Sequence, residues 1–295
     1  MSSVRNPVVN RRTFLKTGAV LSGVALADAG QGSPPEQHRD PFIDTNVTLF
    51  RWPLRRLPLE ATGRLVDKLR SQGITQAWAG SFDVLGKEDL TAVNDRLSEE
   101  CAHNGEGILF PFGSVNPVAA GWADEMKRCV RVHHMRGIRL YPNYHGYALD
   151  DPVFERLLCH AASLNLVVHL VVMIEDDLPV HRLPGGDPVD VSPLAAVIRK
   201  VSGLKLVLLN ALGRVRGPVL DDLVDAGDVS VDTAMLEGVG GLETLLTRVP
   251  GERILFGSHA PFFYFEAAAL KLKEALLTED QSTAIRYANA ARLLG

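Results

Sequence analysis

The strongest constraint on the fold of this chain is a repeated alternation of short apolar runs with amphipathic stretches. From Pro41 onward, eight apolar runs predict β-strands, and the stretches between them carry apolar residues at the i, i+3, i+4 spacing of helices. The predicted strands cover residues 42–46, 74–79, 107–115, 137–141, 166–172, 204–209, 229–232 and 253–256. The predicted helices cover residues 60–72, 88–104, 120–134, 151–164, 191–201, 217–226, 239–248 and 264–276, and a last helix covers 280–293.

The predicted strands are typical of a parallel sheet. Residues 166–172 and 204–209 are almost continuously apolar, as expected of strands that are covered on both faces. Consecutive strands begin about 30 residues apart, which leaves room for one crossover helix between each pair. Eight such units predict an α/β fold of the (β/α)8 TIM barrel type. No shift in composition divides residues 41–295, so a single domain is expected.

Composition excludes several classes of function. Lys and Arg total 31 against 35 for Asp and Glu, so the net charge of −4 argues against a nucleic-acid partner. Beyond the N-terminal segment, no apolar run approaches the roughly 20 residues of a membrane span. Cys101, Cys129 and Cys159 lack the spacing of a metal-binding motif or a disulfide framework, so we expect structural thiols. A small-molecule substrate is the expected partner, and the oligomeric state stays open.

The N-terminal segment carries a targeting pattern. Residues 10–16 read Asn-Arg-Arg-Thr-Phe-Leu-Lys, a weakly apolar run follows, and Ala27-Asp28-Ala29 offers a cleavage site between small residues. This pattern resembles a twin-arginine export signal, which implies the export machinery as a partner and a periplasmic or extracellular location. The predicted organisation is a signal at 1–29, a linker at 30–40 and the barrel at 41–295.

Polar residues gather where the predicted strands end. In a (β/α)8 barrel the chemistry lies at the C-terminal ends of the strands, because the loops that follow them converge on one face. Read in chain order, these positions hold a ring of amides, histidines and one carboxylate: Asn46, Thr48, Ser81, Asn116, residues 141–145, His169, Asn210, Asp232 and His259. This ring predicts a small-molecule site.

Several segments match motifs of a known family in the order of one barrel. Residues 43–48 read Ile-Asp-Thr-Asn-Val-Thr against Ile-Asp-x-His-x-His, and residues 210–213 read Asn-Ala-Leu-Gly against His-x-x-Gly. Residues 253–262 are similar to Arg-hydrophobic-Phe-Gly-Ser-Asp-x-Pro-Phe, and the segments 137–169 and 289–294 match as well. The chain thus resembles amidohydrolase-related proteins, the branch that includes aminocarboxymuconate-semialdehyde decarboxylases and dicarboxylate lactonases. The resemblance covers residues 41–295.

The departures from this pattern bear on the mechanism. The resemblance implies a divalent-metal site at five positions, which in this chain are Asn46, Thr48, His169, Asn210 and His259. Zinc favours His, Cys and carboxylate ligands, and only the strand-5 histidine keeps the identity found in the family. The lactonase branch works without a metal, so the resemblance allows a metal-independent enzyme. We therefore expect no metal cofactor, with a divalent ion such as zinc as the alternative.

Roles follow from residue chemistry and from the resemblance. His259 is expected to activate water as general base, and Asp232 is expected to orient one of the two histidines. His169 is expected either to be the proton partner of His259 or to polarise the scissile carbonyl. The expected substrate-binding residues comprise a carboxylate clamp, two amide donors and two side chains that close over the substrate: Arg139, Asn46, Asn210, Tyr144 and His145.

Three hypotheses for function remain open. The first is a metal-independent hydrolase of the amidohydrolase type, acting on a small acid, ester, lactone or amide. The second is a catalytically retired barrel that binds a small ligand. The third is a divalent-metal hydrolase or decarboxylase with a site rebuilt from His145, His169 and His259.

Overall fold

Eight parallel strands form the centre of the computed structural model, which describes residues 41–86, 89–175 and 183–295. One ladder runs from β1 to β3 and a second from β4 to β8, each in chain order. The strands are β1 Ile43–Leu49, β2 Gln76–Ser81, β3 Leu109–Pro111, β4 Gly137–Leu140, β5 Val167–Val171, β6 Lys205–Leu209, β7 Asp228–Asp232 and β8 Ile254–Leu255. The predicted signal at 1–29 and linker at 30–40 lie outside the described residues.

The two ladders join into a closed barrel. Between β3 and β4, Gly113 and Ile138 form a parallel bridge, and the Arg139 N–H donates to the Gly113 carbonyl at 2.7 Å. Between β8 and β1, Val47 and Ala260 form a second bridge. Every neighbouring pair of strands is therefore hydrogen-bonded, and the predicted (β/α)8 barrel is confirmed.

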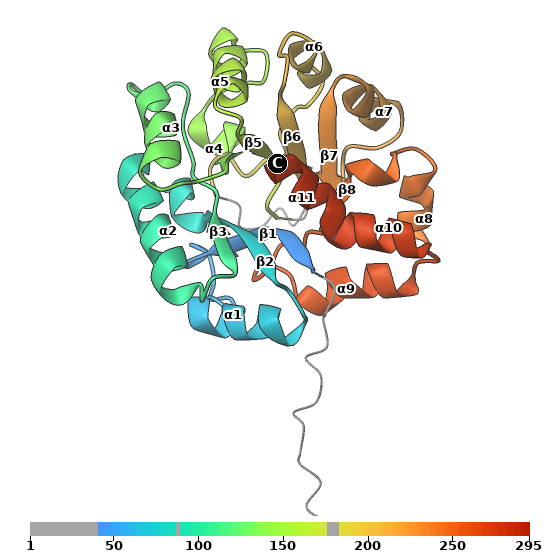
Figure 1. The fold of residues 1–295 in the computed structure, drawn as a ribbon. Helices are drawn as coiled ribbons and strands as arrows, with labels where there is room; N and C mark the ends of the chain where they lie inside the picture. Colours follow the sequence, from blue (N-terminus) through green and yellow to red (C-terminus); the bar gives the residue numbers. More distant parts are fainter. Residues whose placement is uncertain (1–40, 87–88, 176–182) are drawn as a thin grey trace, which may run out of the picture. The chain divides into compact units, whose positions relative to one another are not determined.

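Helices surround the strands on the outside (Figure 1). They follow the strands in the predicted order: α1 Thr62–Ser71, α2 Leu90–Asn104, α3 Trp122–Arg131, α5 Pro152–Ser163, α6 Leu194–Ile198, α7 Pro218–Asp225, α8 Gly241–Leu246 and α9 Phe265–Glu274. The predicted last helix is present as three consecutive pieces, α10 Glu279–Thr283, η3 Ala284–Ala288 and α11 Asn289–Leu294. The short helices η1 Phe82–Leu85, α4 Pro142–His145 and η2 Gly251–Arg253 were not predicted, because one turn is too short to show a period.

Alternate residues of each strand enter two different hydrophobic clusters. Val168 and Leu170 of β5 belong to the cluster that contains most of the buried helix residues. Val167 and Val171 belong to a second cluster, together with Trp78. Because successive side chains of a strand point to opposite faces, the second cluster fills the barrel interior. Both faces of the strands are thus buried, as the continuous apolar runs predicted.

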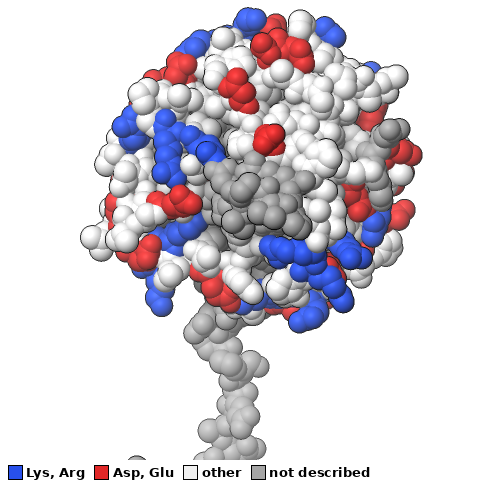
Figure 2. Space-filling view, turned by 180° about the vertical axis from the view of Figure 1, so that it is seen from behind, with Lys and Arg blue, Asp and Glu red and all other residues white. Residues whose placement is uncertain are grey.

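The C-terminal helix marks the end of the barrel opposite to the site. Leu293 is fully buried in the interior cluster, and its carbonyl accepts from Lys205 Nζ, at the first residue of β6, at 2.9 Å. Helix α11 therefore covers the N-terminal ends of the strands (Figure 1). On the face opposite to that view, acidic and basic side chains are interspersed over the described part (Figure 2). Within the described ranges, every helix is too short or too polar to cross a bilayer.

Candidate active site at the strand ends

A buried cluster of two amides and a carboxylate joins β1, β6 and β7 at their C-terminal ends. Asn46 Nδ2 donates to Asn210 Oδ1 and to Asp232 Oδ2, both at 2.7 Å. The Asn210 backbone N–H donates to Asp232 Oδ1 at 2.8 Å, and Asn210 Nδ2 donates to the Met173 carbonyl at 2.8 Å. The structure thus brings three of the predicted residues into direct contact. Asp232 accepts from the side chain of Asn46 and from the backbone of Asn210, whereas the sequence predicts that it orients a histidine.

His259 stands beside this cluster, on the loop after β8. Its backbone has the left-handed φ of 57°, and Asn210 has a φ of 56°, a region in which Asn and His are both enriched among non-glycine residues. His259 Nε2 lies 3.0 Å from the Ile174 carbonyl and 3.5 Å from Asn210 Nδ2, and its ring stacks on Phe262. The carbonyl contact requires a proton on Nε2, so the lone pair lies on Nδ1, which has no partner among the described residues. Burial lowers the pKa of His259 to about 4, so its ring is neutral at pH 7.

The carboxyl groups around the cluster have raised pKa values, in contrast to the lowered pKa of His259. Burial raises the pKa of Asp232 to about 6, although the hydrogen bonds from Asn46 and Asn210 oppose this shift. Burial also raises the pKa of Asp44 to about 7. Asp44 Oδ1 accepts from the backbone N–H groups of Asn46 and Ser258 at 3.1 and 3.0 Å, which ties β1 to the loop after β8.

His169 lies in a different environment from His259. Its ring stacks on Phe112, with centroids 4.4 Å apart, and on Trp78 at 5.4 Å. Neither ring nitrogen has a hydrogen-bond partner within the described part of the chain. Burial and the positive charge of Arg139 hold the pKa of His169 well below its usual value. The described contacts show no hydrogen bond between His169 and His259, so the predicted proton partnership has no direct contact here.

Arg139 points across the barrel from β4 toward β1 and β2. Its Nη1 donates to the Val47 carbonyl at 3.0 Å and to Thr48 Oγ1 at 3.1 Å, and its Nη2 donates to the Trp78 carbonyl at 3.1 Å. The side chain is 1% exposed. Both terminal nitrogens are thus engaged by the protein, whereas the sequence had suggested a clamp for a substrate carboxylate. Tyr141, two residues further along the chain, also interacts with the guanidinium.

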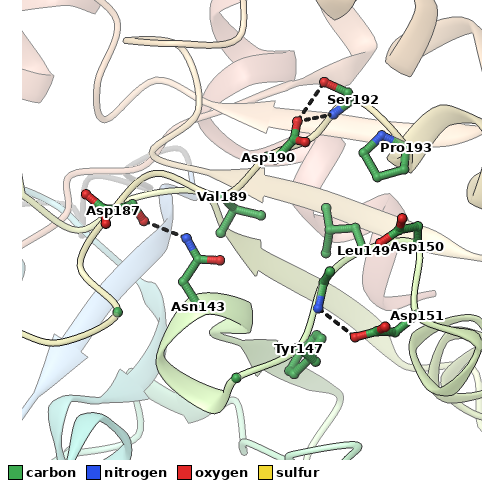
Figure 3. A pocket seen from close by; sticks show the side chains of 13 residues that line it. Asn143, Tyr147, Leu149, Asp150, Asp151, Asp187, Val189, Asp190, Ser192 and Pro193 are labelled. Carbon is green, nitrogen blue, oxygen red and sulfur yellow. Dashed lines mark hydrogen bonds between the residues drawn. The ribbon is translucent and has the colours of Figure 1, made fainter.

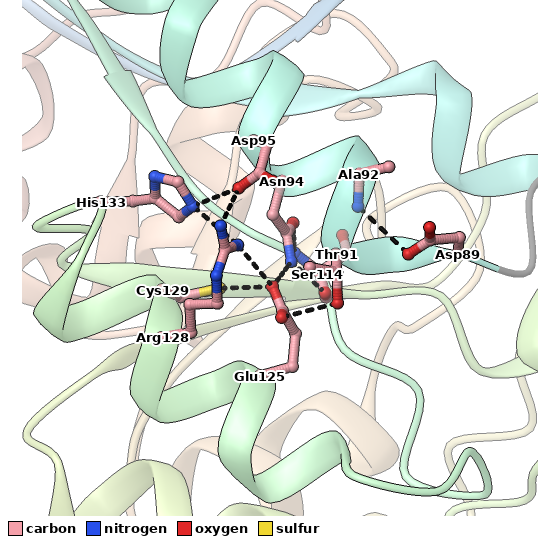
Figure 4. A network of polar contacts seen from close by, with 10 residues as sticks. All are labelled: Asp89, Thr91, Ala92, Asn94, Asp95, Ser114, Glu125, Arg128, Cys129 and His133. Atoms are coloured by element: carbon pink, nitrogen blue, oxygen red, sulfur yellow. Dashed lines mark hydrogen bonds and ion pairs between the residues drawn. The ribbon is translucent and has the colours of Figure 1, made fainter.

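A polar network links α2, α3 and Ser114 (Figure 4), and Ser114 in turn contacts the backbone of Arg139. Ser114 Oγ donates to the Arg139 carbonyl at 2.8 Å. Asn94 of α2 exchanges two hydrogen bonds with the backbone of Ser114, at 2.9 and 2.8 Å. Glu125 of α3 accepts from Asn94 Nδ2 and from Thr91 Oγ1, both at 2.8 Å. Helices α2 and α3 therefore fix the position from which the guanidinium crosses the barrel.

Tyr144 and His145 belong to α4, where the sequence predicted a loop. His145 Nε2 lies 3.3 Å from the Val84 carbonyl, and its pKa is lowered by burial. A cavity of about 790 Å³ opens next to α4, where Asn143 Nδ2 donates to the Asp187 carbonyl at 2.8 Å (Figure 3). Its described walls include neither Tyr144 nor His145.

Sequence reasoning missed the interior side chains on which the site rests. Trp78, Phe112 and Tyr141 line the barrel around His169 and Arg139. The alternation of strand residues was the available signal, since Tyr141 lies two positions after Arg139 and so shares its face. A residue count along the strand does not show which interior side chains touch, because those contacts join different strands.

Comparison with known proteins identifies the family. Residues 53–295 match the family model described as Amidohydrolase, which is most of the chain. The chain belongs to the amidohydrolase family. A search of the curated proteins found no match.

Solved structures of this barrel type superimpose on this amidohydrolase-family chain at low sequence identity. The 5-carboxyvanillate decarboxylase LigW from Sphingomonas paucimobilis is 15% identical with a TM-score of 0.70, over 87% of this chain and 99% of that one. The 2,6-dihydroxybenzoate decarboxylase from Rhizobium is 16% identical with a TM-score of 0.65, over 86% and 98%. A dihydroxybenzoic acid decarboxylase from Polaromonas sp. JS666, solved with bound manganese, is 15% identical with a TM-score of 0.64, over 87% and 97%. Identities this low show a shared fold.

The manganese in the Polaromonas enzyme raises the question of whether the strand ends of this chain fit a metal. Thr48 Oγ1 accepts from Arg139, and Asn46 Nδ2 donates to both Asn210 Oδ1 and Asp232 Oδ2. Neutral amide and hydroxyl oxygens are poor ligands for a transition metal, and here they already bond to one another or to a cation. The amide and hydroxyl groups at Asn46, Thr48 and Asn210 therefore do not fit a divalent metal.

The three histidines of the alternative metal site are not brought together in the described part of the structure. Within the described ranges, no three or more side chains of His, Cys, Asp or Glu are grouped so that they could hold a metal ion. His145 faces the Val84 carbonyl, His169 stacks on Phe112, and His259 faces the Ile174 carbonyl. Each of the three rings is thus fixed by a different neighbour.

Proposed function

We propose that this amidohydrolase-family protein is a hydrolase that acts on a small acid, ester, lactone or amide without a metal ion, with His259 as general base. The observation that carries the proposal is the unpaired lone pair on His259 Nδ1, fixed by the contact of Nε2 with the Ile174 carbonyl. A neutral imidazole whose tautomer is fixed accepts a proton from water when the water attacks a carbonyl carbon. The same ring then returns the proton to the leaving group.

The amide cluster supports the role of His259 as general base because it lies beside the imidazole ring. Asp232 holds Asn46 and Asn210, and Asn210 lies against the His259 ring at 3.5 Å. Asp232 therefore acts as a positioning residue in the proposal, through the two amides.

Decarboxylation of an aromatic acid is the second candidate. The stack of Trp78, Phe112 and His169 gives the barrel interior a buried aromatic wall, which suits an aromatic ring. The structurally similar proteins named above are decarboxylases, and the names of their substrates are those of aromatic acids. The aromatic wall favours this class of substrate whichever bond is broken.

A substrate screen in the presence of a chelator tests the proposal. The purified chain is assayed against lactones, aryl esters, amides and hydroxybenzoates, with EDTA present throughout. We expect turnover that survives the chelator and falls by about 10²- to 10⁴-fold in His259→Ala and His259→Asn. The matched control is His103→Ala, which removes an exposed histidine from α2 and should leave the rate unchanged.

Three results would contradict the proposal in different ways. Activity that EDTA abolishes and manganese restores would replace it with metal-dependent catalysis. Release of carbon dioxide from a hydroxybenzoate, without hydrolysis of any ester, lactone or amide, would favour the second candidate. A ligand that raises the melting temperature and is never turned over would make the protein a binding barrel that has lost its catalysis.

A further inference from the structure

We propose that the guanidinium of Arg139 is the resident cation of the strand-end cluster, and that Arg139 and a divalent metal ion exclude each other from this barrel. The inference rests on the proposed metal-independent function and gives its structural cause. It also assigns Arg139 a positioning role: the guanidinium holds the ends of β1 and β2 in place and does not touch the substrate.

The first support is the geometry of the guanidinium. Arg139 starts on β4 and ends on the opposite ladder, where it bonds two backbone carbonyls and Thr48 Oγ1 at 3.0 to 3.1 Å. Val47 and Thr48 lie in the stretch of β1 that also carries Asn46. The Val47 carbonyl and the Thr48 hydroxyl are therefore bound to a cation that the chain itself supplies.

The second support is the space that β2 leaves for the side chain. A Cβ atom built on Gly80 would lie 2.7 Å from Arg139 Nη1, 2.8 Å from its Cδ and 2.9 Å from its Cζ. Gly80 does not have a left-handed φ, so the backbone alone does not require glycine there. The glycine is explained by the close approach of Arg139, which means that the barrel is shaped around this side chain.

The third support is the balance of charge inside the barrel. The guanidinium is fully buried, and it interacts electrostatically with the carboxyl groups of Asp232 and Asp44. A buried cation needs such counter-charges, because a charge without a partner is strongly destabilising away from water. A divalent ion among the same groups would meet a fixed positive charge, and Thr48 Oγ1 would already be engaged by the guanidinium.

A ligand-restoration experiment tests mutual exclusion without measuring turnover. The triple variant Asn46→His, Thr48→His, His259→Asp introduces strong metal ligands and keeps Arg139, and a quadruple variant adds Arg139→Met. Each is titrated with Co²⁺ and followed by its visible absorption, and zinc content is measured by elemental analysis. We expect the quadruple variant to bind Co²⁺ roughly 100-fold more tightly than the triple variant, because the competing cation is gone. Equal affinities in the two variants would overturn the proposal.

If the quadruple variant does not fold, a double-mutant cycle on thermal stability tests the proposal instead. Melting temperatures are compared for the wild type, Arg139→Met, Asp232→Asn and the double variant. If Arg139 is the counter-cation of Asp232, removal of the carboxylate charge should restore part of the melting temperature lost in Arg139→Met. Losses that simply add would overturn the assigned charge balance.

The result for mutual exclusion can be distinguished from the result for the proposed hydrolase function. If the wild type carries stoichiometric metal with Arg139 in place, mutual exclusion fails whatever the protein catalyses. If the metal results are as expected and no substrate is turned over, the cation assignment stands and the hydrolase proposal fails.

Discussion

Replacement of Gly80 by alanine is a direct test of the interior geometry. The added methyl group would lie under 3.0 Å from three atoms of Arg139, and this side chain cannot swing aside without losing hydrogen bonds to Val47, Thr48 or Trp78. Overpacking of this kind costs about 1–3 kcal/mol, and one weakened buried hydrogen bond adds about 1 kcal/mol. Alanine recovers about 0.5–1 kcal/mol of backbone entropy. The net expected loss is therefore about 2 kcal/mol.

Thermal unfolding, followed by circular dichroism, provides the assay. For a domain of this size, about 2 kcal/mol corresponds to a fall in melting temperature of roughly 4–8 °C. The matched control is Gly63→Ala in α1, where an added Cβ meets no atom within 4 Å. Because alanine is the better helix former, the control should melt at or slightly above the wild-type temperature. If the melting temperature of Gly80→Ala equals that of Gly63→Ala, Arg139 does not cross β2 as described, and the argument built on that crossing fails.

Two further predictions concern buried titratable groups. Burial raises the pKa of Asp44 to about 7, so its contribution to stability is full below the unfolded value of 3.8 and is lost as the pH rises through 7. The melting temperature of the wild type should therefore fall more steeply between pH 5 and pH 8 than that of Asp44→Asn, and parallel curves would contradict this assignment. Burial also raises the pKa of the Cys101 and Cys129 thiols to about 12, whereas Cys159 is exposed. Ellman's reagent should titrate Cys159 alone in the native protein and the other two thiols only after denaturation, and rapid reaction of a second thiol would refute the burial.

Amides, a hydroxyl and a guanidinium meet at the strand ends of this chain. A barrel tolerates exchange of residues at these positions because its stability comes from the interior layers and the outer helices, and its chemistry comes from the loops and strand ends. Family membership therefore fixes the architecture of this protein more firmly than its reaction.

The sequence by itself determined the architecture. The order of strands and helices follows from local periodicity, and parallel pairing follows from the apolar runs at 166–172 and 204–209. The convergence of Asn46, Asn210 and Asp232 was also predictable, because the ends of parallel strands in a barrel must meet on one face. These inferences need no knowledge of which side chains touch inside the barrel.

Only the tertiary structure decided which neighbours each interior side chain contacts. Arg139 and His169 are paired in register on β4 and β5, yet one crosses to Thr48 while the other stacks on Phe112. The direction of Arg139 depends on the empty space at Gly80, 59 residues earlier in the chain. Contacts of this kind depend on the packing of side chains from distant strands, and local patterns carry no information about them.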